Sequence, residues 1–415
     1  MDKLLFVVRA YSTTGAQPNR FRQLHKHLKS RFEIHVLELT HGVGGIRVEE
    51  RIIIHSLEYS KLGKLLNPDK KRASLANSSD VKNPLDSARI LIKKLIRNLL
   101  FPDSVVPEAF RIRKEVRRLV SIYGFRLIVV SAFPFTTLCS IGGLRKIFKV
   151  KIVLDIGDPF YSNSDNGSLR DLLARQFEKH YLKEIDALVV TNANTKTHYL
   201  TTFNNQIQTE SVYIVEQGVN EEFIRAVNMV TSEANRNSSD IRLVYAGQLY
   251  RKLREPFNLY KAVEICNSSC SGIKISLHMY GTYNKDFYPR GGVSENIKMM
   301  GQVSFEEIVK VILGADIVVF IDNAFGLQTP GKIFELALLK KHVLFISDNL
   351  DSPASSVARS YNHFHFTGNS PMQIAQAIDK ILSSGEVPEQ ETLNKNFLWE
   401  KKADEYTKVF DSLLA

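Results

Sequence analysis

Cysteine is scarce in this sequence, and its three residues, Cys139, Cys266 and Cys270, make an odd number. An odd number gives no paired disulfide framework, which favours a reducing compartment, and the cysteines also lack the spacing of zinc ligands. Long apolar runs are absent too, since none approaches the roughly 20 residues that cross a bilayer. The first apolar run is too short for a signal peptide. These absences favour a cytoplasmic protein that is soluble or peripheral on the inner face of the cell membrane.

The length and the apolar pattern indicate the fold class. With 415 residues, of which 44% are hydrophobic, the chain is too long for one core, and two domains are expected. Short β-branched runs such as Leu4 to Val8 and Ile317 to Ile321 alternate with segments of helical spacing in both halves. This alternation predicts an α/β protein with two parallel-sheet domains. The Ser- and Asn-rich stretch from Asn228 to Asp240 is the predicted linker.

Basic residues are concentrated in one stretch. The formal net charge is +11, and residues 89–118 hold nine basic and three acidic residues, which gives 9 − 3 = +6. From Leu91 to Leu100, apolar residues recur at helical spacing opposite Arg89, Lys93 and Arg97. A helix of this kind can lie on an anionic membrane surface, or it can pack on the core with a solvated charged face. A nucleic-acid partner is disfavoured, because no aromatic residues interleave with the basic ones.

The stretch from Asp316 to Ile346 contains the clearest motif. Two short apolar strands flank one helix-like segment, which indicates a βαβ unit. We expect Thr329 to cap this helix and Pro330 to be its first residue, with the backbone of Gly331 exposed. The unpaired amides and the dipole at such a helix start suit a phosphate, and Lys332 adds a full charge.

Glu335 lies three residues after Lys332, so both side chains share one face of the predicted helix. A carboxylate one turn inside a phosphate-binding helix can accept hydrogen bonds from both hydroxyls of a ribose. The alternative is an ordinary capped helix with an ion pair between Lys332 and Glu335. The spacing alone does not decide between the two.

This segment resembles a known family. The run TPGKIFELALLKKHVLFI is similar to the P-x-K-x-x-E segment of the family 4-like (group 1) glycosyltransferases, which use nucleotide sugars and have the GT-B fold. The resemblance implies two Rossmann-like domains with parallel sheets facing an interdomain cleft. It also implies that Glu335 binds the donor ribose and that the turn of Pro330, Gly331 and Lys332 lies at the diphosphate. The first glutamate of the E-x7-E pattern of many members is absent, because Leu327 stands in its place.

Two carboxylates follow another predicted strand. Asp155 and Asp158 lie at the end of the run from Lys151 to Ile156, at the edge where open α/β sheets bind ligands. Either could orient an acceptor hydroxyl or act as a base, or both could simply cap the loop. The motif DIGDPF resembles the D-x-R-D-P-W sequence of a subset of the same transferases, and the earlier FPD and SAFP segments match that subset in the same order. Gly157 replaces the arginine and Phe160 the tryptophan.

The loop after the first strand contains a glycine and two arginines. Gly15 matches the family's loop beside the donor sugar and phosphate, although a lone glycine also fits a plain βα turn. Arg20 and Arg22 could meet anionic groups at the helix that follows.

A basic turn opens the predicted second domain. Gly247 ends its first strand, and Arg251 and Arg254 lie in the turn before the next helix, a position suited to a diphosphate. Relatives read G-x-L-x-x-x-R-x-P here, and the spacing leaves both arginines eligible. The alternative is a basic surface turn. By resemblance, the backbone near Val303 holds the nucleotide base.

We therefore predict a hexosyltransferase-type glycosyltransferase with residues 1–225 for the acceptor, residues 226–394 for the donor, and a helix at 395–415 that packs back on the first domain. The family implies retention at the anomeric carbon. The lack of any Asp-x-Asp motif argues against the metal-dependent transferase architecture, so neither a metal nor a cofactor is expected. The basic stretch favours a glycan or lipid-linked acceptor, as in surface polysaccharide or glycolipid biosynthesis. The alternatives are a UDP-sugar epimerase of the same fold and a catalytically lapsed binding subunit.

Overall fold

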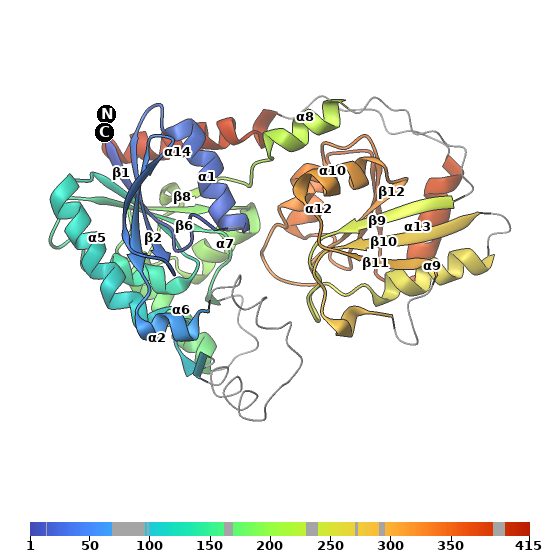
Figure 1. Cartoon of the computed structure of the whole chain (residues 1–415), viewed down its shortest axis with the longest axis horizontal. Coiled ribbons are helices and arrows are strands. Elements are labelled where there is room, and N and C mark those ends of the chain that lie inside the picture. The colour runs from blue at the N-terminus through green and yellow to red at the C-terminus, as the bar shows by residue number, and fades with distance from the viewer. Residues whose placement is uncertain are drawn as a thin grey trace. The chain divides into compact units, whose positions relative to one another are not determined.

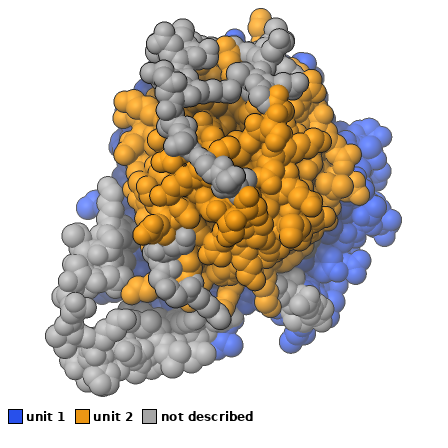
Figure 2. Space-filling view, turned by 90° about the vertical axis from the view of Figure 1, so that its right-hand side faces the viewer, with its two compact units in different colours: residues 1–216, 399–415 blue, residues 217–398 orange. Residues whose placement is uncertain are grey.

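The computed structural model describes residues 1–13, 15–68, 96–97, 99–161, 169–229, 240–269, 273–289, 295–384 and 395–415. These residues form two compact units, each with its own sheet (Figure 1), and Figure 2 colours the two units separately. Unit 1 comprises residues 1–216 and 399–415, and unit 2 comprises residues 217–398. The chain therefore leaves unit 1 after Glu216 and returns to it after Leu398.

Unit 1 contains an eight-stranded sheet in the order β3-β4-β2-β1-β5-β6-β7-β8. Neighbouring strands are parallel except for the antiparallel pair β3 and β4. The strands are β1 (Lys3–Val7), β2 (Glu33–Thr40), β3 (Gly45–Glu49), β4 (Ile52–Glu58), β5 (Leu127–Ser131), β6 (Lys151–Ile156), β7 (Ala187–Val190) and β8 (Val212–Ile214). The described helices are α1 (Ala16–Leu28), α2 (Lys61–Leu66), α5 (Ala109–Tyr123), α6 (Leu169–Leu182), α7 (Ala193–Thr202) and α14 (Trp399–Leu414), with short turns η1 (Val106–Glu108), η2 (Phe135–Ser140) and η4 (Thr209–Ser211).

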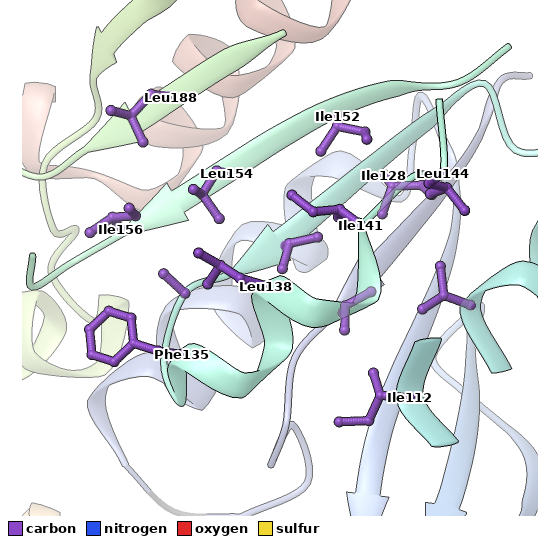
Figure 3. Close-up of a cluster of buried hydrophobic side chains, with 14 of the residues drawn as sticks. Ile112, Ile128, Phe135, Leu138, Ile141, Leu144, Ile152, Leu154, Ile156 and Leu188 are labelled. Atoms are coloured by element: carbon purple, nitrogen blue, oxygen red, sulfur yellow. The ribbon is translucent and has the colours of Figure 1, made fainter. Parts of the chain in front are cut away.

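The central strands of unit 1 are apolar on both faces because helices cover both sides of the sheet. Every residue of β5 and of β7 is buried. On one face, Ile112 of α5 and Leu138 of η2 join a cluster that contains Ile128 and Ile152 (Figure 3). On the other face, α1 and α14 pack against the alternate residues of the same strands.

Unit 2 contains a six-stranded sheet in the order β11-β10-β9-β12-β13-β14, and all of its neighbouring strands are parallel. The strands are β9 (Asp240–Ala246), β10 (Lys274–Tyr280), β11 (Ile297–Gly301), β12 (Ile317–Ile321), β13 (His342–Ile346) and β14 (Phe364–Thr367). The described helices are α8 (Glu221–Met229), α9 (Phe257–Ser269), α10 (Phe305–Leu313), α11 (Lys332–Leu336), α12 (Pro353–Ala358) and α13 (Pro371–Ser384), with short turns η5 (Lys285–Phe287) and η6 (Lys395–Phe397).

Both sheets reverse their order at the first strand. In unit 2 the chain begins at β9, adds β10 and β11 on one side, and then adds β12, β13 and β14 on the other. In unit 1 the same reversal lies between β1 and β5. At such a switch point the loops leave the carboxyl ends of two adjacent strands in opposite directions, and ligands bind in the crevice between them. The topology therefore predicts that ligands bind at the carboxyl edge of each sheet.

The boundary between the units lies before the predicted one at residue 225. Helix α8 belongs to unit 2, because its Phe223 and Val227 are buried in the core of that unit. The predicted linker overlaps the end of α8, and its residues 230–239 lie outside the described residues. Helix α14 belongs to unit 1, where it contacts α1. Within the described ranges, no helix is both long and apolar enough to cross a bilayer.

Candidate functional site

Four strands of unit 2 end at one edge in small or polar residues. Gly247 follows β9, Gly281 follows β10, Asp322 follows β12 and Ser347 follows β13. The backbone N–H of Gly247 donates to the carbonyl of Tyr280 at 3.1 Å, which joins the first two loops. Gly281 has a φ of +152°, and a Cβ at this residue would lie 2.2 Å from the Gly247 carbonyl oxygen. Only glycine therefore fits there, and the two loops approach backbone to backbone.

A pocket lies beside the switch point of this sheet. Its lining includes three residues that were predicted to bind the donor, namely Gly247, Arg254 and Lys332. Most of the remaining lining is apolar and comes from the ends of β9 and β12, with Ile312 and Leu336. The structure thus gathers Gly247 and Arg254 of the loop after β9 and Lys332 of α11 at the edge where open α/β sheets bind ligands.

Arg254 is the arginine of this pocket, and Arg251 is exposed in the turn before it. The Nη2 of Arg254 donates to Oδ1 of Asn323 at 2.6 Å, and its Nη1 donates to the carbonyl of Gln248 at 3.3 Å. Its Nε is buried and has no hydrogen-bond partner among the described residues. The guanidinium is therefore held in place by its neighbours, which include the Tyr245 hydroxyl.

Asn323 is held in turn by the buried carboxylate of Asp322. This carboxylate accepts hydrogen bonds from the backbone N–H of Asn323 and from the hydroxyls of Ser347 and Ser352. Burial raises the pKa of Asp322 above its ordinary value, while these donors act in the opposite direction. Sequence reasoning missed Asp322 and Asn323, although a polar pair directly after a buried strand is a signal that could have found them.

The helix after Pro330 is shorter than predicted. Helix α11 has 5 residues and starts at Lys332, with Gly331 as an N-cap that makes no side-chain hydrogen bond. Thr329 and Pro330 lie before it, so the predicted capping by Thr329 is wrong. The N–H of Ile333 bonds to the Pro330 carbonyl at 3.0 Å in a tight turn, which uses an amide that was expected to be unpaired. Because so short a helix has a small dipole, Lys332 itself is the main positive group here.

Lys332 and Glu335 form the ion pair of the alternative interpretation. Lys332 Nζ lies 3.0 Å from Glu335 Oε2, and the side chains are 28% and 21% exposed. This Oε2 is shielded from solvent, and in the part of the chain that the structure describes its contact is the ion pair with Lys332. The carboxylate therefore retains the capacity to accept hydrogen bonds from a ligand's hydroxyls.

The other predicted donor-binding residues lie in loops of both units. Val303 is half-buried and comes shortly after β11, the strand beyond β10 in the sheet. Gly15 belongs to unit 1, where it precedes α1 with a φ of +148°, a conformation that favours glycine. The adjoining loop is ordered by Arg22, which donates to the carbonyls of Tyr11 and Thr13, each at 2.6 Å.

Asp155 is buried inside unit 1 and bonded to other side chains. It is 2% exposed, accepts a hydrogen bond from the Tyr406 hydroxyl of α14, and lies 3.4 Å from Nε of Arg20. Arg20 also donates to the carbonyls of Val215 and Glu216, at 2.8 and 2.9 Å. These contacts fasten α1, β6 and α14 together. The anionic group that Arg20 meets is therefore Asp155 of the protein itself.

Asp158 is the carboxylate of the predicted pair that reaches the surface of unit 1. The residue as a whole is exposed, yet desolvation by the protein atoms around its carboxyl group raises its pKa to about 6. A group with this pKa can exchange a proton near neutral pH. The two predicted carboxylates therefore differ in location: Asp155 lies inside the fold, and Asp158 lies at the carboxyl edge.

The loop after Asp158 is held by Glu178 of α6, which is fully buried. Its carboxylate accepts hydrogen bonds from the backbone N–H groups of Phe160 and Tyr161, at 3.1 and 3.0 Å, and from the hydroxyl of Tyr199. Burial raises the pKa of Glu178, and the three donors oppose that rise. The sequence has no signal for this contact, because Glu178 looks like one polar residue on an amphipathic helix.

The basic stretch at 89–118 is described only in part, and its residues 89–95 and 98 lie outside the described residues. Helix α5 buries Ile112, Val116 and Leu119 against the sheet, so this part packs as a core helix with a charged outer face. In the described ranges, no three His, Cys, Asp or Glu side chains cluster as metal ligands would.

The whole chain resembles known proteins of two-unit α/β architecture, although no protein-family model matches it. It is 22% identical over 332 residues to an uncharacterised glycosyltransferase of Methanocaldococcus jannaschii, covering 76% of this chain and 82% of that protein. Sucrose-phosphate synthase from Thermosynechococcus elongatus has a TM-score of 0.66 at 14% identity and covers 100% of this chain and 99% of its own. The UDP-GlcNAc 2-epimerase from Methanocaldococcus jannaschii has a TM-score of 0.54 at 11% identity, with 99% of both chains covered. The structural likenesses extend over both units and show a shared fold.

Proposed function

We propose that this chain, which has the fold of the GT-B superfamily, is a glycosyltransferase that moves a sugar from a nucleotide-sugar donor to an acceptor. The fold prediction is confirmed, since both units are parallel-sheet α/β structures that match solved proteins over their full length. The activity is inferred from the chemistry of the pocket in unit 2 together with the resemblance to a curated glycosyltransferase.

The observation that carries the proposal is the pair of polar groups at the carboxyl edge of unit 2 that the protein does not fully satisfy. In the described ranges, Arg254 Nε is buried without a hydrogen bond, and Glu335 Oε2 is shielded from solvent with Lys332 Nζ 3.0 Å away. Buried polar groups are normally paired, so unpaired ones at a ligand edge indicate partners that a ligand supplies. A nucleoside diphosphate has both kinds of partner, because its phosphates accept from a guanidinium and its ribose hydroxyls donate to a carboxylate.

In this proposal, Arg254 and Lys332 neutralise the diphosphate as the bond to the sugar breaks. Their charges are held in place before the reaction, so they stabilise the departing group without reorganising. Glu335 binds the donor ribose, the turn of Pro330 and Gly331 lies along the diphosphate, and the backbone near Val303 contacts the base. Retention of configuration and metal-independent leaving-group stabilisation are part of the proposal.

The acceptor side is assigned to unit 1. Asp158 is the proposed group for orienting an acceptor hydroxyl or taking its proton, because its pKa of about 6 suits proton exchange near neutral pH. Asp155 fastens the fold behind it, and Gly15 shapes the first loop. We propose a glycan or lipid-linked acceptor, as in surface polysaccharide or glycolipid biosynthesis, and a site of action in the cytoplasm at the inner face of the cell membrane.

The second candidate function is that of a UDP-sugar epimerase. The UDP-GlcNAc 2-epimerase has the same fold, and an epimerase would form product from donor alone, without any acceptor. A lapsed, binding-only subunit is the third reading, because Leu327 and Gly157 stand where many relatives carry a glutamate and an arginine.

The test is calorimetric titration of the full chain with UDP, GDP, ADP and CMP, repeated with Glu335→Ala. We expect one nucleotide to bind with micromolar affinity and the variant to bind it roughly 10- to 100-fold more weakly, since a hydrogen bond to a charged group contributes about 1.5–3 kcal/mol. The fold should persist, because Lys332 and Glu335 form a partly exposed pair on one helical turn. Binding of no nucleotide would reject the donor site and favour the lapsed subunit.

A further inference from the structure

Asn323 lies at the carboxyl edge of unit 2, beside Arg254. It follows β12, the strand next to β9, and comes two residues after Ile321 of the pocket lining. The N–H of Ala324 donates to the Leu253 carbonyl at 2.8 Å, so the loop after β12 is fastened to the loop that carries Arg254. The two side chains are therefore held next to each other by the backbone as well as by their own hydrogen bond.

The contact with Arg254 determines the orientation of the Asn323 amide. A guanidinium only donates hydrogen bonds, so the atom that lies 2.6 Å from Nη2 of Arg254 must be the carbonyl oxygen Oδ1 of Asn323. The other end of the amide is Nδ2, which carries two N–H donors. These donors are left for another partner.

The protein does not supply that partner within the residues that the structure describes. There the side chain of Asn323 accepts from Arg254, and its backbone N–H donates to Asp322, but Nδ2 makes no hydrogen bond. Nδ2 is not shielded from solvent, although the residue as a whole is only 7% exposed. Because polar groups in such surroundings are normally paired, an accessible and unpaired donor at a ligand edge indicates a partner that a ligand supplies.

The carboxylate of Asp322 keeps Asn323 in this position. One oxygen accepts from the backbone N–H of Asn323 at 2.8 Å, and the other accepts from the hydroxyls of Ser347 and Ser352, at 3.1 and 2.5 Å. The hydroxyl oxygen of Ser352 in turn accepts from the N–H of Ser355, at the start of α12. Asp322 is 4% exposed and both of its oxygens are engaged by the protein, so it orients Asn323 and does not contact a ligand.

The neighbours of the amide define the chemistry of its ligand. Nδ2 is a neutral donor, so its partner must be an acceptor oxygen. Arg254 and Lys332 line the adjoining pocket, and the oxygen therefore belongs to an anion with several oxygens that can meet both cations and the amide. The diphosphate of a nucleotide-sugar donor is an anion of this kind.

We propose that Asn323 is a further donor-binding residue, whose amide orients Arg254 through Oδ1 and binds the diphosphate through Nδ2. This proposal rests on the proposed function, because the diphosphate is that of the nucleotide-sugar. The departing group then meets one charged and one neutral donor that are held as a single unit before the reaction. The alternative is that Asn323 acts only through Arg254 and does not contact the ligand.

The experiment is a double-mutant cycle, in which calorimetry measures the affinity of the full chain for UDP, GDP and ADP, up to millimolar ligand. The variants are Asn323→Ala, Arg254→Ala and the combination of the two. We expect Asn323→Ala to weaken binding of the preferred diphosphate roughly 10- to 100-fold, because a hydrogen bond to a charged group and the orientation of Arg254 are both lost. In the Arg254→Ala background, Asn323→Ala should still weaken binding about 3- to 10-fold, because Nδ2 contacts the phosphate itself.

Two controls separate this contact from a general disturbance of unit 2. Asn267 donates from Nδ2 to the carbonyls of Val263 and Ile275, at 3.0 and 2.8 Å, near the amino end of β10 and thus at the opposite edge of the sheet. Asn267→Ala should lower the urea midpoint of unfolding and yet bind the diphosphate as the unchanged chain does. The nucleoside of the preferred base has no phosphate, so Asn323→Ala should change its affinity by less than about twofold.

Three results would overturn the proposal. The first is that Asn323→Ala binds the diphosphate as tightly as the unchanged chain. The second is that Asn323→Ala has no effect in the Arg254→Ala background, which would show that Asn323 acts only through Arg254. The third is that Asn323→Ala weakens nucleoside and diphosphate binding equally. Each of these leaves the donor site standing, whereas binding of no nucleotide by the unchanged chain would reject the donor site together with this proposal.

Discussion

Replacing Gly281 by alanine tests whether the close approach of the β9 and β10 loops forms the donor site. A Cβ at this residue would lie 2.2 Å from the Gly247 carbonyl oxygen and 2.9 Å from the Tyr283 ring and hydroxyl. The N–H of Gly247 donates to the Tyr280 carbonyl at 3.1 Å, which fixes the backbone of Gly247. The Gly247 carbonyl therefore cannot move aside as a flexible side chain would. The substitution must therefore displace Gly247, which lines the pocket.

Two costs add in this variant. The positive φ of 152° is a strained conformation for alanine and costs about 1–2 kcal/mol, and the enforced shift of packed backbone adds about 1–3 kcal/mol. Gly301 provides a matched control in the same sheet, because its φ is +77° and a Cβ there would meet no atom within 4 Å. Gly301→Ala should therefore carry only the first cost.

Urea unfolding, followed by a spectroscopic signal from unit 2, measures the difference in unfolding free energy between the two variants. Nucleotide titration measures the effect of Gly281→Ala on the pocket. We expect Gly281→Ala to lose more unfolding free energy than Gly301→Ala by about 1–3 kcal/mol, and to bind nucleotide at least tenfold more weakly than the unchanged chain. Equal destabilisation by the two variants would refute the close approach. Unchanged nucleotide affinity in a destabilised Gly281→Ala would show that the β9 and β10 loops do not shape the site.

Two further predictions concern the arginines and Asp158. Arg254→Lys should weaken nucleotide binding about tenfold in calorimetry, because the planar guanidinium held by Asn323 is lost. Arg251→Lys should change the affinity by less than about twofold, because Arg251 is exposed. The reverse order would make Arg251 the residue that binds the nucleotide. Turnover should fall as the pH is lowered through about 6, where the carboxyl of Asp158 takes up a proton, and Asp158→Asn should lack this pH limb; a limb that persists in the variant would remove Asp158 from the reaction. Because the pKa of Asp158 is raised in the fold from 3.8 to about 6, its ionised form destabilises the fold above pH 6 and ceases to do so as the pH falls toward 4. Urea unfolding should accordingly find Asp158→Asn at least as stable as the unchanged chain at pH 7, with the difference vanishing near pH 4.

The parallel strands were predictable because parallel sheets bury both faces of a strand and leave a continuous apolar run in the sequence. β6 and β12 have the predicted bounds, and β1 differs by one residue at each end from the predicted run Leu4 to Val8. The hairpin of β3 and β4 was missed, since β3 is a largely exposed edge strand with little apolar pattern. Helix α2 likewise has little apolar pattern, because only Gly63 and Leu66 are buried in it.

The site was predictable where chemistry is local and unpredictable where it depends on the fold. Gly247 and Lys332 could be found from residues next to one predicted strand or helix, and the structure brings them to one pocket. The choice of Arg254 over Arg251 depends on Asn323, which is 69 residues away in sequence. The burial of Asp155 depends on Tyr406, which is 251 residues away. Spacing within one segment contains no information about such partners.

The return of the chain to unit 1 after Leu398 has a consequence for how the protein is made. Trp399, Tyr406 and Phe410 of α14 are buried in the same cluster as Phe21 of α1, so unit 1 lacks part of its core until α14 has left the ribosome. The intervening unit 2 spans residues 217–398, which take on the order of 10–40 s to synthesise. During that time the face of unit 1 that receives α14 is uncovered, whereas unit 2 is contiguous and can fold as soon as it emerges. Unit 1 is therefore synthesised first but can complete its core only after α14 has emerged. Until then its apolar face must be kept from aggregating.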